Sequence, residues 1–206
     1  MKDRQRSKVY AWERKFISDF DKNTLTENDC IKIFNQLQKG FNSSHDRDMD
    51  LSLRFMNGHG RCWFSEGERE VVLRVDYGLN WQVLLHEYSH AITEITRYQK
   101  SKSEAFDWFA DSEGVPKKAI SFTSNEFMDY CIWESNRKVD VPVVESHGGE
   151  FVANYSVLLH LFHPKHPSFR ELAQSLRDAN VDWSDFKSSL AWKVFRRRKI
   201  KIAEAA

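Results

Sequence analysis

The sequence is poor in cysteine and proline, and the cysteine shortage excludes two classes of protein. It has 206 residues but only 3 cysteines and 4 prolines. The cysteines, Cys30, Cys62 and Cys131, stand alone, and no two of them form a C-x-x-C pair. This pattern excludes a disulfide-stapled secreted scaffold and a zinc ribbon built on cysteine pairs. The three residues are predicted to be free thiols in a reducing compartment.

The sequence also lacks a long apolar run and a dominant charge. No segment approaches the roughly 20 apolar residues that a membrane-spanning helix needs, and the first residues are charged. The net charge is only +1, so the chain as a whole is neither a polyanion binder nor an acidic tail protein. We therefore expect a cytoplasmic protein that makes no membrane contact.

The remaining composition is that of one globular domain. Hydrophobic residues make up 41% of the chain, which is enough for a core at this length. The sequence contains no internal repeat and no low-complexity segment. We expect a single domain over 1–206, with an insertion at about 100–144 and a basic C-terminal helix or tail at about 183–206.

The spacing of apolar residues predicts two helices, a small sheet and then further helices. The first helix is expected over 5–20 and the second over 26–39, with Gly40 ending the second. The apolar positions of the second helix are Ile31, Phe34 and Leu37. The strands are expected to form a small, mostly antiparallel sheet from 51–56, 61–64 and 70–75, the last two joined by a hairpin turn. This order suits an α+β, zincin-like domain.

The most informative segment is His86-Glu87-Tyr88-Ser89-His90, an H-E-x-x-H motif within an apolar helical stretch. Histidines four positions apart lie on one face of a helix, so both imidazoles can reach one metal ion. The glutamate after the first histidine can face a metal-bound water and accept its proton. The motif is typical of zinc hydrolases, most often peptidases.

The context of this motif favours the metal interpretation over a solvated helix face. With 8 histidines in the chain, a chance match has a probability of roughly a few per cent. The flanking apolar residues recur at helical spacing, so the helix is packed on one side. A strand-like run at 71–75 precedes the helix, and Asn80 offers an N-cap.

A hydrolytic zinc usually has three protein ligands, so a third must come from elsewhere in the chain. His147 is the strongest candidate, because it stands just before a second amphipathic helix and is followed by a glycine pair. Glu150 competes with it, since glutamate is a normal third ligand in one large class of zinc peptidases.

These residues resemble the SprT-like (Spartan-like) zinc metallopeptidases. The H-E-x-x-H at 86–90 is followed well downstream by H-G-x-x-F at 147–151, and in that group the histidine of the second motif is the third zinc ligand. The segment 5–13 is also similar to the start of small uncharacterised metallohydrolases of actinobacteria and phages. The resemblance implies Zn²⁺ as the cofactor, with Glu87 as the general base and with three ligands: His86, His90 and His147.

The resemblance leaves two regions to be explained. SprT-like proteins often carry a C-terminal zinc ribbon or a cysteine-based DNA-binding region, and neither is present here. The long separation between His90 and His147 implies an inserted subdomain beside or over the cleft. The C-terminal segment is basic and predicts either a phosphate-backbone contact with DNA or a solvated helix end. The residues concerned are Lys193, Arg196, Arg197, Arg198, Lys199 and Lys201.

The predicted function is zinc-dependent hydrolysis, most often of peptide bonds in a protein or peptide substrate, with DNA association as an option. Two alternatives stay open: a non-peptidase metal hydrolase, and a zinc-stabilised nucleic-acid-associated binding protein without turnover. Asn154 and Tyr155 are candidate oxyanion donors. His163 and His166, in a proline-rich turn, are expected to be solvated. The carboxylates considered as partners of the zinc-binding histidines are Asp107, Asp111 and Glu145.

Overall fold

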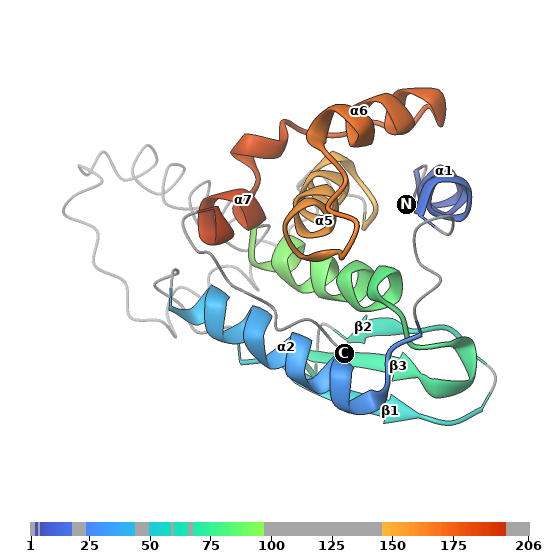
Figure 1. The fold of residues 1–206 in the computed structure, drawn as a ribbon, viewed down its shortest axis with the longest axis vertical. Coiled ribbons are helices and arrows are strands. Elements are labelled where there is room, and N and C mark those ends of the chain that lie inside the picture. Colours follow the sequence, from blue (N-terminus) through green and yellow to red (C-terminus); the bar gives the residue numbers. More distant parts are fainter. Residues whose placement is uncertain are drawn as a thin grey trace, which may run out of the picture. The chain divides into compact units, whose positions relative to one another are not determined.

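The computed structural model describes residues 3, 5–17, 24–43, 50–58, 60–65, 68–96 and 146–196. Apart from 95 and 96, all of these residues belong to one compact unit of the chain. This unit has a mixed α+β fold of helices around a small sheet (Figure 1). The predicted insertion at about 100–144, and Asp107, Asp111 and Glu145 with it, lie outside the described residues.

The N-terminal segment is helical but changes its winding. Helix α1 (Arg6–Trp12) continues directly into a π-helical turn, η1 (Glu13–Ile17), and the rest of the helix predicted over 5–20 lies outside the described residues. The indole N–H of Trp12 donates to the hydroxyl of Ser175 at 2.9 Å, which ties this segment to helix α6 (Phe169–Asp178). A π-helical turn within an α-helix is rare, and such turns are often found at functional sites.

Helix α2 (Glu27–Asn42) begins at a reciprocal capping box between Thr26 and Asp29 and runs past the predicted end. Gly40 lies inside the helix because the next residue, Phe41, is fully buried and extends the apolar face by one turn. Ile31, one of the three apolar positions named from the sequence, does not face the core, since it is 41% exposed. The core positions of this helix are Cys30, Ile33, Phe34, Leu37 and Phe41.

The sheet has three strands, β1 (Ser52–Met56), β2 (Trp63–Ser65) and β3 (Glu70–Arg74), in the order β1-β3-β2. The prediction of a mostly antiparallel sheet is wrong, because only β2 and β3 pair antiparallel, whereas β1 and β3 are parallel. The reason is the course of the chain after β1. It crosses to the far side of β3 before forming the hairpin, so β1 and β3 run in the same direction. The buried residues of β3 stand at the centre of the sheet.

Residues 81–96 form a helix that follows β3 after a short 3-10 turn, η2 (Val75–Tyr77). The side chain of Asn80 accepts the N–H of Val83 at 2.8 Å and so caps the helix start. Gly78, at φ 95°, takes the left-handed conformation that turns the chain between the two elements. The ring of Tyr88 packs edge-on against Phe34 of α2, which sets one face of the helix into the core.

Helix α5 (Gly149–Phe162), which the sequence predicts to be amphipathic, is buried on all sides from Phe151 to Leu159. Asn154 donates to the hydroxyl of Thr93 at 3.2 Å and accepts the N–H of Ala191 at 3.0 Å. These bonds join α5 to the 81–96 helix and to α7 (Leu190–Phe195).

The C-terminal helices differ in part from expectation. Ser168 and Glu171 form a reciprocal capping box at the start of α6. The helix expected from residue 183 appears only as a 3-10 turn, η4 (Phe186–Ser188), followed by α7. Within the described part of the chain, no helix has both the length and the apolar character needed to cross a bilayer.

His163, at the end of α5, is buried rather than solvated, with 2% of its surface exposed. Its Nδ1 accepts the backbone N–H of Lys165 at 3.1 Å, so the neutral ring closes the turn that follows the helix. Burial lowers the pKa of His163 to about 4, with the charges of His166 and Lys165 acting in the same direction. The proline-rich turn therefore contributes a buried neutral imidazole, whereas His166 is exposed as expected.

This burial makes the stability of the fold sensitive to acid. The unfolded chain binds a proton at the ordinary histidine pKa of 6.5, while the folded chain does so only near 4. Stability is therefore full above pH 6.5, and up to about 3 kcal/mol is lost as the pH falls from 6.5 to 4. Urea unfolding across this range should show the loss. A His163→Asn variant should flatten this part of the profile, and a His166→Asn control should not.

Candidate metal centre

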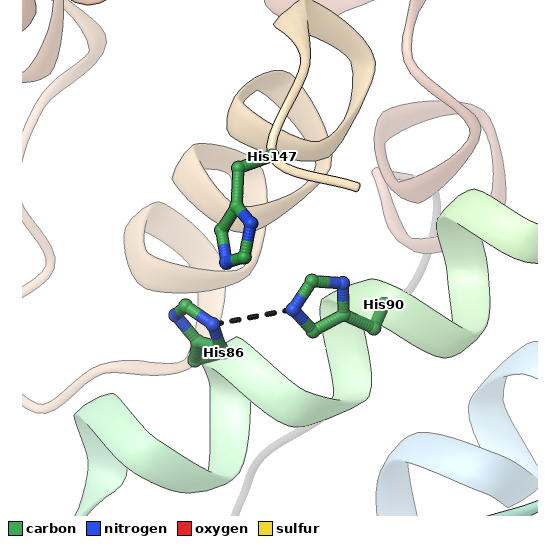
Figure 2. A group of neighbouring side chains, drawn as sticks. All are labelled: His86, His90 and His147. Carbon is green, nitrogen blue, oxygen red and sulfur yellow. Dashed lines mark hydrogen bonds between the residues drawn. The ribbon is translucent and has the colours of Figure 1, made fainter. Parts of the chain in front are cut away.

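Three histidines from two elements converge on one point (Figure 2). His86 and His90 project from the 81–96 helix, and His147 projects from the turn just before α5. One ligand atom from each ring lies within 4.8 Å of the others, and the Nε2 atoms of His86 and His90 are 3.2 Å apart. Two nitrogens that share a tetrahedral zinc at the usual bond length stand about 3.3 Å apart. The group can therefore hold a metal ion.

The ring of Phe151 packs against all three histidine rings. Phe151, one turn into α5, lies with its ring centroid 5.0 Å from that of His86, 4.3 Å from His90 and 4.9 Å from His147. His86 and His147 are buried, and His90 is half-buried. The phenylalanine of the H-G-x-x-F segment thus has a physical role, because it restricts the rotamers of all three imidazoles.

Glu13 holds the outer nitrogen of His86. Its Oε1 is 2.5 Å from Nδ1 of His86, and Glu13 is only 3% exposed although it lies 73 positions away in the sequence. A carboxylate on Nδ1 keeps the proton there and leaves the lone pair of Nε2 directed at the centre of the group. Burial alone would lower the pKa of His86, but the charge and hydrogen bond of Glu13 outweigh it and raise the pKa.

Asp3 holds the outer nitrogen of His147 in the same way. Its Oδ2 is 2.7 Å from Nδ1 of His147 and also accepts the hydroxyl of Ser146 at 2.6 Å. Burial would raise the pKa of Asp3, but the hydrogen bonds from Ser146 and His147 outweigh it and lower the pKa. Burial lowers the pKa of His147, against the opposing effect of Asp3.

One ring nitrogen of His147 lacks a hydrogen-bond partner among the described residues. This atom, Nε2, is buried. A buried nitrogen lone pair without a donor is costly, and a metal ion at the centre of the group would satisfy it. Three imidazoles, two of them with a carboxylate behind the ring, form a donor set that zinc takes in proteins, although imidazole also suits copper, iron and nickel. The residues present therefore fit the predicted ion.

Sequence reasoning missed both carboxylates that support the histidines. Glu13 carried a readable signal, because it stands four positions after Val9, on the apolar face of its helix, where a charge is rarely left without a partner. Asp3 carried no such signal, since it precedes α1 and has no periodic context. Glu13 ends the segment 5–13 whose likeness to other metallohydrolases was noted from the sequence, and Asp3 lies just before that segment.

Glu87 lies in the same helix turn as the two histidines and is 6% exposed. Burial raises the pKa of its carboxyl to about 7; the charge of His86 opposes the rise and that of Glu13 adds to it. The backbone of Phe64, in β2, hydrogen-bonds to this carboxyl. A carboxyl with a pKa close to neutral is suited to accept and return a proton.

A cavity of about 230 Å³ opens beside His86 and Glu87. Its walls come from η1, from the segment before β2 and from the start of the 81–96 helix. The lining residues besides His86 and Glu87 are Tyr10, Glu13, Arg14, Arg61, Cys62, Tyr77, Gln82 and Val83. The cavity therefore places the Glu87 carboxyl within reach of a bound molecule.

Tyr10 is one of two tyrosines that line this cavity. Its ring stacks on His86 at 5.6 Å and is tilted against His147 at 5.2 Å. Burial raises its pKa, and the charge of Glu87 adds to the rise, so the hydroxyl stays protonated and can donate a hydrogen bond. The oxyanion candidates from the sequence are placed differently: Asn154 joins helices, and the hydroxyl of Tyr155 donates to the carbonyl of Gln82 at 3.4 Å.

The structure also places the remaining predicted residues. Among the described residues, Glu150 is not part of the metal-competent group, whereas His147 is. Lys193 and Arg196 are exposed in and just after the last turn of α7. The other basic residues of the predicted DNA contact lie outside the described residues: Arg197, Arg198, Lys199 and Lys201.

Comparison of the chain with protein-family models, with curated proteins and with solved structures finds no match. The chemistry of the site therefore has to carry any assignment of function. The likeness to the SprT-like group rests on the two motifs alone.

Proposed function

We propose that this chain is a zinc metallopeptidase in which Glu87 is the general base toward an attacking water. The observation that carries the proposal is the convergence of three imidazoles beside a buried carboxyl and an open cavity. A structural zinc usually has four protein ligands, whereas a catalytic zinc has three and leaves one position for water. The described residues offer three, which favours the catalytic class.

The ion would be held by His86, His90 and His147. When bound, zinc lowers the pKa of a coordinated water to near neutrality and polarises a carbonyl group. Asp3 and Glu13 keep their histidines in the tautomer that presents Nε2 to the ion.

The chain's own side chains supply the rest of the reaction. Glu87 accepts a proton from the attacking water and delivers it to the nitrogen of the leaving amine. The hydroxyl of Tyr10, a residue that lines the cavity, stays protonated and donates to the oxygen that becomes negative during attack. The buried ring of Phe151 excludes solvent from the side of the histidines that it covers.

The likeness to SprT-like peptidases supports this assignment, because both motifs contribute side chains to one site. We further propose that the exposed cations at the end of α7, Lys193 and Arg196, belong to a surface that contacts a DNA backbone. The free thiols of Cys30 and Cys62 support a reducing, cytoplasmic setting.

The test is metal removal followed by metal return. We expect one zinc per chain by elemental analysis and cleavage of unfolded casein, with activity lost on treatment with a chelator and restored by stoichiometric zinc. A control chain treated with chelator and then magnesium should stay inactive, because magnesium prefers oxygen ligands. If the zinc-loaded protein cleaves neither casein nor DNA-crosslinked protein, it is not a peptidase, and the alternatives without peptide cleavage gain.

A further inference from the structure

The loop that joins β1 to β2 crosses the end of β3 and is held there by Arg74, the last residue of that strand. The guanidinium Nη1 of Arg74 donates to the carbonyl of Asn57 at 2.7 Å. The backbone N–H of Arg74 donates to Sγ of Cys62 at 3.1 Å. One residue therefore holds both the first and the last residue of the loop.

The middle of the loop also fits closely against this side chain. A Cβ at Gly60 would lie 3.1 Å from Nε of Arg74, so a side chain there would displace the guanidinium group. The guanidinium carbon lies 5.3 Å from the centre of the Trp63 ring, within the range of a cation–π contact. Asp76, in η2, adds a further tie, because its Oδ2 accepts the N–H of Gly58 at 2.5 Å. The loop is therefore fixed to the end of β3 and to η2.

The loop and η2 supply one wall of the cavity beside Glu87. Arg61 and Cys62 come from the end of the loop, and Tyr77 comes from η2. Tyr77 is 63% exposed, and an exposed aromatic side chain on an anchored turn is suited to contact a substrate. Within the described chain, the metal-competent group contains none of these three residues. A shift of this wall should therefore change substrate binding without changing the metal ligands.

Stability alone does not account for an arginine at position 74. Its Nε is buried and has no hydrogen-bond partner among the described residues. A buried donor without a partner destabilises a fold, and natural proteins keep such costs mainly at functional sites. The position of Arg74 under a cavity wall gives the cost a reason.

We propose that Arg74 is a positioning residue of the active site, which holds the wall formed by Arg61, Cys62 and Tyr77 where a peptide substrate binds. This inference rests on the proposed function, because the wall has this role only beside a reacting bond. The planar guanidinium group is required, since it reaches the carbonyl of Asn57 while it packs against Gly60. The compact ammonium group of lysine has no such plane.

The first test is the kinetics of Arg74→Lys in the zinc-loaded protein. With a fluorogenic peptide, KM should rise roughly tenfold, because displaced binding residues lose their fit to the substrate. The kcat and the zinc content should stay close to those of the unmodified protein, since Glu87 and the histidines are untouched. Arg54→Lys is the matched control, because Arg54 lies on the neighbouring strand and pairs with Glu70 at 2.7 Å.

Gly60→Val tests the same contact from the side of the loop. It leaves Arg74 in place but inserts a side chain where the Cβ alone would stand 3.1 Å from Nε. The same rise in KM is expected, again with kcat and zinc content preserved. This second variant keeps the test decisive if Arg74→Lys folds poorly.

A thiol measurement reports the position of the loop without any turnover. Cys62 is half-buried in the cavity wall, whereas Cys30 is fully buried. Burial raises the pKa of the Cys62 thiol, so release of the loop should increase its thiolate fraction. Alkylation by iodoacetamide, read by peptide mass spectrometry, should become roughly tenfold faster at Cys62 in both variants and stay unchanged at Cys30.

The outcomes separate the two levels of inference. A protein that cleaves peptides but shows unchanged KM and Cys62 alkylation in both variants refutes the positioning role and leaves the peptidase standing. Equal acceleration at Cys62 and Cys30, or loss of zinc, would also refute that role. A zinc-loaded protein that cleaves no peptide refutes the proposed function and this inference with it. A raised KM with preserved kcat, together with faster alkylation at Cys62 alone, supports both.

Discussion

Replacing Glu87 by glutamine will abolish peptide hydrolysis while leaving zinc in place. Glutamine has nearly the same shape, so the buried position between His86 and the cavity stays filled. It cannot accept a proton, however, and loss of general base catalysis lowers kcat by roughly 10²- to 10⁴-fold. Zinc content and affinity should change little, since the three imidazoles are untouched. Steady-state cleavage of a fluorogenic peptide, with elemental analysis of the same sample, measures both.

Glu150→Gln is the matched control for this variant. Glu150 is also a carboxylate near the site, in the first turn of α5, but it does not belong to the histidine group among the described residues. Its amide variant should keep both zinc and activity. Full activity of Glu87→Gln would show that Glu87 is not the base, and loss of zinc from Glu150→Gln would return Glu150 to the list of ligands.

Replacing Glu13 by glutamine will weaken zinc binding by roughly ten- to a hundredfold, the usual effect of removing a carboxylate behind a metal-bound histidine. The amide can still accept the hydrogen bond from Nδ1 of His86, so the ring should stay in place. What is lost is the negative charge that makes the imidazole more basic. Competition with a chelating dye gives the dissociation constant, and Asp3→Asn should act in the same direction through His147.

Glu68→Gln serves as the control, because Glu68 is an exposed carboxylate of the hairpin whose ion pair among the described residues is with Arg54, at 3.8 Å. It should bind zinc like the unmodified protein. Circular dichroism must show intact helices in the Glu13→Gln, Asp3→Asn and Glu68→Gln variants. Unchanged zinc affinity in a folded Glu13→Gln protein would mean that the contact with His86 does not support the metal.

The histidine group could be predicted from the sequence because the positions of its ligands depend on residues that are close together in the chain. Helical spacing alone places His86 and His90 on one face, and the structure brings their inner nitrogens to 3.2 Å. The position of His147 came from a motif, and the motif describes a short turn and the first turn of a helix. Caps behave in the same way: Asn80 and Ser168 were readable because each acts on residues three positions away.

Features that depend on tertiary docking were not readable. The contacts of Asp3 and Glu13 span 144 and 73 positions, and nothing in the spacing of either residue specifies its partner. The parallel pairing of β1 with β3 has the same origin. The alternation of residues in a strand defines its faces but not its neighbours, so the crossover after β1 could not be derived.

Asp3 and Glu13 of the N-terminal segment hydrogen-bond to two of the three histidines, so a bound ion would also stabilise the docking of that segment. Asp3 and Glu13 are drawn to imidazoles whose outer protons become more acidic when the inner nitrogens are coordinated. Metal coordination by the histidines and docking of residues 3 and 5–17 would therefore be thermodynamically coupled. Stripping the ion should be felt first as fraying at the front of the chain, where amide protons would exchange with solvent while the buried α5 helix stays closed.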